Sequence, residues 1–202
     1  MWAMVMDNYD LVLNQLIERL ARFNYAIVAS RTGAEFDLDN DALKLRFLGE
    51  DYIVTKKDCK CLGSNDSSKD HVLVVDYLLS FGGLDSGDGW IDFRDLPNSM
   101  PYDGAFRANV ESVLERNVSN IIARKNELIK KLDGYRVPLF SCSDFAVAFQ
   151  VFPRVECLVI LCEGDDEIGP GAKLLFSSKA PQFLSTESLA AIAEALTRRL
   201  VE

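Results

Sequence analysis

Two cysteines separated by one residue are the first feature of this chain that could do chemistry. In Cys59-Lys60-Cys61, two thiolates could bind a soft metal or close a strained, reversible disulfide, and the neighbouring lysines favour the thiolate form. A closed zinc or iron–sulfur site needs four ligands, and the other three cysteines of the chain lie singly. Cys59 and Cys61 are therefore metal-ligand candidates, although we expect them to be ordinary loop residues.

The single histidine, His71, limits the catalytic chemistry that is open to the chain. A Ser/His or Cys/His nucleophilic site would have to use this one imidazole. Metal sites built on two or more histidines are excluded. Because His71 stands at the start of an apolar helical segment, we expect a structural role for it.

An acidic turn over residues 163–167 places four carboxylates directly after an apolar strand. Clustered oxygen ligands suit calcium or magnesium, but the alternating ligand spacing of an EF-hand loop is missing, which favours a solvated turn. Residues 83–89 contain the glycines of a phosphate loop without its GK[ST] ending. The sequence contains no nucleotide fingerprint, nucleophile elbow or HExxH motif.

The elements that must position these residues follow from apolar periodicity. Spacings of three and four predict amphipathic helices over residues 9–23, 71–81, 106–132 and 185–200. Alternation and short apolar runs predict strands over residues 35–38, 42–47, 52–55, 145–152, 155–162 and 172–176, with a polar surface loop over residues 56–70. We therefore expect a single α+β domain over residues 1–202, with a mainly antiparallel sheet on which N-terminal, long central and C-terminal helices pack.

Charge and composition indicate which partners the protein does not bind and in which compartment we expect it. The 202 residues include 31 acidic and 22 basic side chains, and the resulting net charge of −9 argues against nucleic acid and anionic membranes as partners. No run approaches the roughly 18 apolar residues of a membrane span, and no basic residue precedes Arg19 as a secretory signal requires. The odd number of cysteines does not suit a disulfide framework, so we expect an acidic cytoplasmic protein.

Two blocks of sequence carry a family resemblance. Residues 71–107 contain an apolar helix followed by WIDFRDLP, a tyrosine and FR, and residues 151–196 contain PRV, an apolar strand, GDDEIGP, KLLF and LSTE. This succession resembles the domain-of-unknown-function family numbered 3786, found in anaerobic bacteria and archaea, over roughly residues 10–200. The chain departs from the family pattern where the expected proline after Glu167 is displaced to Pro170, and it has no added four-cysteine cluster module.

The positions that match the family pattern imply a shared ligand-binding surface. Its candidate residues are Trp90, Arg94, Tyr102, Arg107, Arg154, Asp165, Asp166 and Lys173. The structural alternative is that Trp90 and Phe106 belong to the core and that the arginines pair with carboxylates such as Asp92.

Two functions from different classes remain open. The resemblance favours a non-enzymatic binding or accessory domain, tied to corrinoid, tetrapyrrole or iron–sulfur metabolism in an anaerobe and acting on a protein partner or a small-molecule ligand, with no cofactor assigned. The alternative is an enzyme in which Arg94, Arg107 and Arg154 clamp a small anionic substrate, with Asp165 or Glu167 as acid/base. The enzyme requires these arginines and the acidic turn to converge on one cleft.

Overall fold

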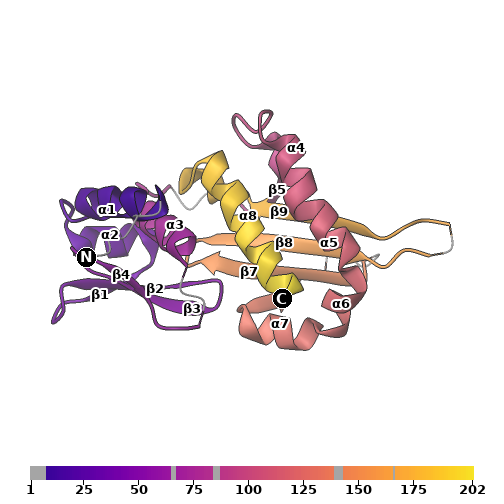
Figure 1. Ribbon diagram of the computed structural model, residues 1–202, viewed down its shortest axis with the longest axis horizontal. Coiled ribbons are helices and arrows are strands. Elements are labelled where there is room, and N and C mark those ends of the chain that lie inside the picture. The colour runs from indigo at the N-terminus through magenta and orange to yellow at the C-terminus, as the bar shows by residue number, and fades with distance from the viewer. Residues whose placement is uncertain (1–7, 65–66, 84–86, 139–142, 166) are drawn as a thin grey trace, which may run out of the picture.

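The chain folds into two antiparallel sheets with helices, which confirms the α+β class (Figure 1). The computed structural model describes residues 8–64, 67–83, 87–138, 143–165 and 167–202. Its elements are α1 (Asn8–Leu20), α2 (Tyr25–Thr32), β1 (Glu35–Asp37), β2 (Ala42–Phe47), β3 (Glu50–Val54), β4 (Cys59–Cys61), α3 (Ser68–Leu79), β5 (Trp90–Asp92), η1 (Phe93–Asp95), α4 (Asp103–Phe106), η2 (Arg107–Glu111), α5 (Ser112–Arg116), α6 (Val118–Ala123), α7 (Lys125–Lys131), β6 (Gly134–Arg136), β7 (Phe145–Phe152), β8 (Val155–Cys162), β9 (Gly171–Ser177), η3 (Ala180–Gln182) and α8 (Thr186–Val201).

The first sheet has the strand order β1-β2-β3-β4, and α1, α2 and α3 lie around it. The predicted hairpin is present, with Leu43 opposite Val54 and Leu45 opposite Tyr52. Its tight turn is Leu48-Gly49, where both residues have positive φ, 49° and 80°. Glycine is required at position 49, because a Cβ there would lie 2.1 Å from the Lys131 carbonyl oxygen.

Residues 56–70 are not all loop, and this part of the prediction was wrong. Strand β4 pairs with β3 in antiparallel register, and α3 begins at Ser68. Three residues are too few to show a periodicity of their own, so only the long-range hydrogen bonds to β3 define the strand.

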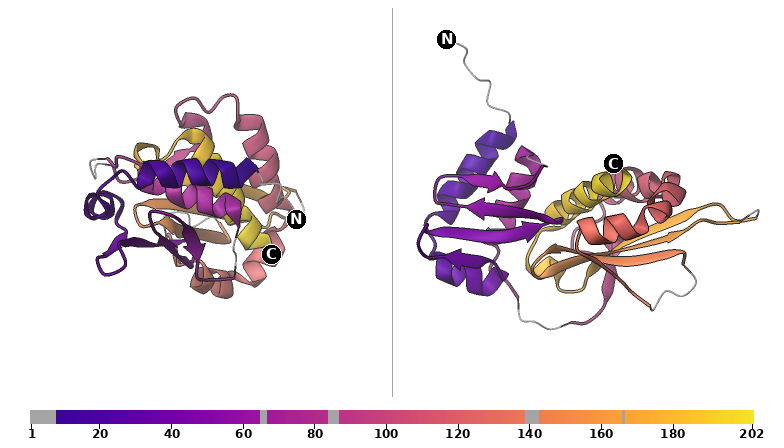
Figure 2. Two further views of the ribbon diagram at one scale, coloured as in Figure 1. Left: turned by 60° about the vertical axis from the view of Figure 1, so that its left-hand side comes forward. Right: turned by 90° about the horizontal axis from the view of Figure 1, so that it is seen from below.

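The second sheet has the strand order β5-β9-β8-β7-β6. Strands β7 and β8 have the predicted limits, because apolar residues run continuously on both sides of the Pro153-Arg154 turn. The helices α5, α7 and α8 cover one face of this sheet (Figure 2). The two sheets meet where the Leu48 N–H donates to the Val151 carbonyl of β7, at 3.3 Å.

The long helix predicted over residues 106–132 is interrupted, which corrects the sequence-based prediction. A π-helical turn, η2, follows α4, and breaks at Asn117 and Arg124 separate α5, α6 and α7. At the first break the Asn117 side chain donates to the Val113 carbonyl at 2.8 Å and offers the backbone an alternative to helical pairing. The apolar stripe nevertheless stays continuous, so the segment still covers one face of the sheet.

The C-terminal helix α8 carries a buried charge into the interior. Ser185 caps the helix by accepting from the Ser188 N–H at 3.1 Å, as its position predicts. Near the other end, the Arg199 Nη2 lies 2.7 Å from the Asp70 Oδ2 on α3, and both side chains are at most 2% exposed. The Arg199 Nη1 also donates to the Leu48 carbonyl at 3.0 Å, so one side chain of α8 binds both α3 and the β2–β3 turn.

No helix in the described ranges is long and apolar enough to cross a membrane.

Removing the buried carboxylate tests how much this ion pair stabilises the fold. Asp70→Ala leaves the Arg199 charge buried without its partner, and we expect the free energy of unfolding to fall by about 3–5 kcal/mol. The control is Asp39→Ala, which removes an exposed carboxylate on the β1–β2 turn and should change stability by less than about 0.5 kcal/mol. Urea unfolding followed by circular dichroism measures both variants, and equal losses would contradict the assignment.

Candidate functional site

Five of the eight predicted ligand-binding residues lie at one corner of the second sheet. We call this region, residues 90–111 together with Lys173, the β5 corner. Strand β5 pairs with β9 and then turns through η1 into a loop over residues 97–102, from which α4 and η2 start. The predicted residues at this corner are Trp90, Arg94, Tyr102, Arg107 and Lys173.

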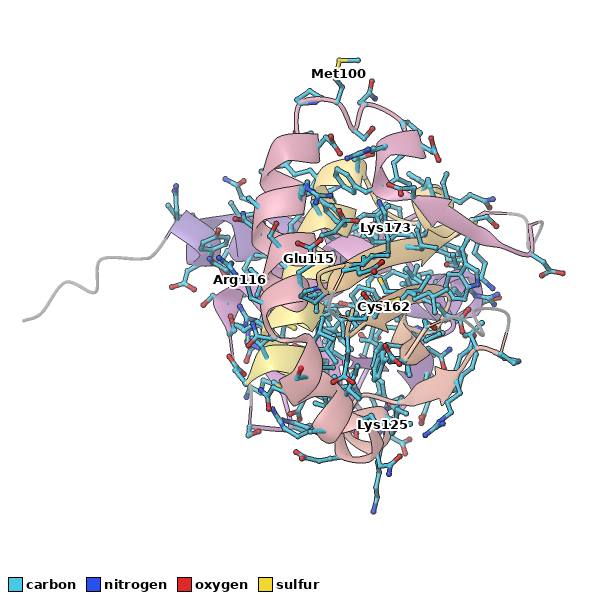
Figure 3. The ribbon with its side chains drawn as sticks, turned by 90° about the vertical axis from the view of Figure 1, so that its right-hand side faces the viewer. Met100, Glu115, Arg116, Lys125, Cys162 and Lys173 are labelled. Atoms are coloured by element: carbon cyan, nitrogen blue, oxygen red, sulfur yellow. The ribbon has the colours of Figure 1, made fainter. Side chains whose placement is uncertain are left out.

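A network of ion pairs around Lys173, which is labelled in Figure 3, forms the inner part of the β5 corner. The Lys173 Nζ lies 2.8 Å from the Asp92 Oδ2 and 3.1 Å from the Glu111 Oε1. The Arg107 Nη1 lies 3.4 Å from the other oxygen of Glu111, whose side chain is only 4% exposed. Arg107 also reaches Glu115. Both oxygens of the buried Glu111 are therefore paired within the protein.

The network shifts the pKa values of its partly exposed members. Desolvation acts to raise the pKa of Asp92, but hydrogen bonds from Lys173 and from the Arg94 N–H outweigh it and hold that pKa below its usual range. Desolvation likewise acts to lower the pKa of Lys173, and hydrogen bonds to Asp92 and Glu111 raise it overall. These two groups are thus held in their charged forms.

The backbone at Glu111 has an unusual form. The five residues of η2 make a π-helical turn that closes with the Ser112 N–H donating to the Arg107 carbonyl. Phe106, just before this turn, is buried and stacked on Phe93, with ring centroids 4.0 Å apart. Isolated π turns within helices are frequent at functional sites. The buried position of Phe106 agrees with the structural alternative for that residue.

The outer part of the corner is the loop over residues 97–102, which we call the Met100 loop. The Met100 side chain is 88% exposed at its tip (Figure 3). The Ser99 hydroxyl donates to the Arg94 carbonyl at 2.8 Å, and the Tyr102 N–H donates to the Ser99 carbonyl at 2.8 Å. Asn98 has a positive φ of 59°, a conformation that asparagine tolerates better than most residues.

Two surface hollows flank the Met100 loop. One, of about 610 Å³, is lined by Arg94 and Met100, and Arg94 is held there by Asp103 at 3.1 Å. The other, of about 280 Å³, lies between Tyr102 and the first residues of α8. The Thr186 hydroxyl of α8 donates to the Pro97 carbonyl and fixes the loop against that helix. The loop is therefore an apolar projection braced at both ends.

The other predicted site residues lie elsewhere. Arg154, in the β7–β8 turn, donates to the Ser30 carbonyl at 3.3 Å. Asp165 is exposed in the β8–β9 connection, at the opposite end of β8, where hydrogen bonds from the Glu167 and Ile168 N–H groups lower its pKa. Asp166 lies outside the described residues. The arginine clamp and acidic turn of the enzyme hypothesis are thus not brought to one cleft.

The two clustered cysteines lie on β4 rather than in a loop. Being two apart on a strand, Cys59 and Cys61 point to the same side, and Cys59 is buried. None of the cysteines that the structure describes forms a disulfide, and Cys142 lies outside those residues. Across the described ranges, no group of three or more potential ligands is arranged to hold a metal ion. Metal binding by this pair stays a prediction.

Sequence reasoning missed two residues of the β5 corner. Glu111 stands three residues before Leu114 and seven before Val118, on the buried stripe of its helix. A carboxylate on the buried face of a helix indicates a buried ion pair. No comparable signal marks Met100, because an apolar residue between two prolines does not reveal its exposure.

Comparison with known proteins gives one match. The family model described as "Domain of unknown function (DUF3786)" matches residues 24–199. The chain belongs to this family. No curated protein and no solved structure matches it. The DUF3786 match spans both sheets, so the β5 corner and β4 both belong to the family domain.

The pH dependence of stability tests the network of this DUF3786 protein. Lys173→Met should lower the free energy of unfolding by about 1 kcal/mol, since water screens a lysine that is 41% exposed. Because the Asp92 pKa is lower in the folded protein, its ionised carboxylate stabilises the fold at pH values above its unfolded pKa of about 3.9. This stabilisation is lost as the pH falls through the lower pKa of the folded state. Because the Lys173 pKa is higher in the folded protein, its ammonium group stabilises the fold at pH values below its unfolded pKa of about 10.4. This stabilisation is lost as the pH rises through the higher pKa of the folded state.

The difference between wild type and Lys173→Met should therefore stay constant from about pH 5 to 9 and shrink on either side. Lys130→Met, which removes an exposed lysine on α7, should show no such pattern. Chemical unfolding across this pH range measures both. A difference that grows on acidification would contradict the network.

Proposed function

We propose that the protein is a non-enzymatic accessory domain that binds a partner protein through the Met100 loop. The exposure of Met100 on a braced loop is the observation that carries this proposal. Because the backbone of the loop is already ordered, binding costs little further backbone entropy. Methionine is also enriched at the centre of protein interfaces.

The exposed charged residues around the loop indicate the chemistry of the partner surface. Asp95 and Glu187 are exposed carboxylates beside the loop and make no ion pair with any residue that the structure describes. Arg94, in contrast, is neutralised by Asp103. The partner surface is therefore an apolar pocket for Met100 framed by lysines or arginines, which also suits a chain of net charge −9.

The placement of the charged residues supports binding over catalysis. Arg94 and Arg107, which the enzyme hypothesis needed for a substrate anion, are already paired with Asp103 and Glu111 of the β5 corner. The family resemblance suggests that the partner serves corrinoid, tetrapyrrole or iron–sulfur metabolism in an anaerobe, and that this takes place in the cytoplasm.

Substitution at the tip of the loop tests the proposal. A photo-crosslinking amino acid at position 100 identifies the partner in a native extract, and calorimetry with the purified partner then gives its affinity. Met100→Asp should weaken binding at least tenfold, because it places a charge in an apolar pocket. Leu38→Asp, a matched change at a residue 78% exposed on the β1–β2 turn, should leave the affinity unchanged.

Two results would contradict the proposal. One is an unchanged affinity for Met100→Asp, and the other is an equal loss for Leu38→Asp. A thermal-shift screen of the isolated protein with cobalamins and haem separates the binding of a partner from that of a cofactor. A cofactor that raises the melting temperature equally in wild type and Met100→Asp would point to a ligand site away from the loop.

A further inference from the structure

Arg31, in the last turn of α2, lies between two aromatic rings. Its guanidinium carbon is 5.3 Å from the centre of the Phe23 ring and 5.4 Å from the centre of the Phe81 ring. These are the distances of cation–π contacts, so both rings hold the guanidinium in place. Ile27, one turn earlier, lies on the same face of the helix. We call Phe23, Ile27, Arg31 and Phe81 the Arg31 patch, and the proposed function does not use it.

A turn after α3 brings Phe81 to this position. The turn is at Gly82, where φ is 70°. A Cβ at Gly82 would lie 3.3 Å from the Arg31 carbonyl oxygen, so glycine allows this chain segment to pass close to the end of α2. The close approach places the Phe81 ring beside the guanidinium.

The Arg31 guanidinium has no carboxylate partner among the described residues. Its Nη2 donates to the Leu78 carbonyl at 3.2 Å, and its buried Nε makes no hydrogen bond with any residue that the structure describes. Burial lowers the pKa of Arg31, as expected when no anion compensates for the lost hydration. Arg107 and Arg199, in contrast, pair with carboxylates. The charge of Arg31 is therefore left for an anion from another molecule.

The apolar members of the Arg31 patch project from the surface. Phe81 is 74% exposed and Ile27 is 63% exposed. Aromatic residues and arginine are enriched at protein interfaces, and arginine is frequent among the residues that dominate binding. Small molecules bind in concave pockets, whereas these side chains stand out from the fold. The surface that covers them is therefore that of another protein.

We propose that the Arg31 patch is a second docking surface, which binds a partner segment that carries an aspartate or glutamate between apolar residues. The partner carboxylate pairs with the guanidinium, whose planar fork suits a carboxylate, and the apolar neighbours cover Phe81 and Ile27. Because the two rings and the hydrogen bond to Leu78 already hold Arg31, the ion pair costs little further side-chain entropy.

This surface differs from the Met100 loop in position and in charge. Helix α2 lies beside the first sheet, whereas the Met100 loop projects from a corner of the second (Figure 1). Exposed carboxylates stand beside the Met100 loop, but the Arg31 patch presents a cation. The two surfaces therefore select different segments, and failure of one proposal leaves the other standing.

Peptide selection on the whole protein tests the proposal. A random peptide library displayed on phage is first depleted on Arg31→Gln and then selected on wild type. The recovered peptides should carry an aspartate or glutamate next to apolar residues. Changing that carboxylate to its amide should weaken binding to wild type at least about tenfold in fluorescence polarisation, and should have little further effect on Arg31→Gln.

Phe81→Ser tests the apolar part of the patch and should also weaken these peptides at least about tenfold. The matched controls are Arg116→Gln, at an exposed arginine of α5, and Leu38→Ser, at an exposed leucine. Both controls and Met100→Asp should leave the affinity unchanged.

Three results would overturn the proposal. They are a selection that yields no peptide, recovered peptides that lack a carboxylate, and a loss in Phe81→Ser no greater than in the controls. If Arg31→Gln does not fold, Phe81→Ser replaces it in the depletion step, because Phe81 is exposed and its substitution leaves the core intact.

Discussion

The buried ion pair between Asp70 and Arg199 is the interaction on which the arrangement of the two sheets depends. Burying both charges costs several kcal/mol each, and this is offset only when the remaining donors and acceptors are also engaged. Here Asp70 also meets Arg198 at 3.3 Å, and the Arg199 guanidinium lies 5.5 Å from the centre of the Phe47 ring. Helix α8, near the C-terminus, is thereby fixed to elements from the first half of the chain.

The cost of burying charges also explains why other charged residues form ion pairs between elements. The second ion network, around Glu111, plays the corresponding part at the far edge of the second sheet, where it joins β5 and β9 to the central helices. Charged side chains that looked available for a ligand in the sequence are thus engaged in holding elements together. The feature left for the proposed function is the exposed methionine at the tip of the Met100 loop.

The sequence predicted the elements better than their arrangement. The limits of β7 and β8 were predicted correctly because long apolar runs around Pro153-Arg154 are a local signal. The division into two sheets was not foreseen, since strand pairing is set by contacts between distant residues, as in the hydrogen bond from Leu48 to Val151. The breaks at Asn117 and Arg124 were missed because the apolar stripe continues through them.

The candidate site was also predicted only in part. Arg94, Tyr102, Arg107 and Lys173 were selected through the family pattern, and the fold brings them to one corner. Arg154 and Asp165 were selected by the same pattern but lie at opposite ends of β8, because a pattern along the chain carries no information on spatial proximity. Exposure, which distinguishes Met100, depends on tertiary structure alone.

Native-state hydrogen exchange tests most directly whether the ion pair makes the two sheets one cooperative unit. Its probes are the amides of β3 and α3 on one side and those of β7 and α8 on the other. The account predicts that the slowest amides of both groups exchange with the same free energy of opening, because breaking the contact of Arg199 with Asp70 exposes both sheets together. A first sheet that opens at a clearly lower free energy than the second would contradict it.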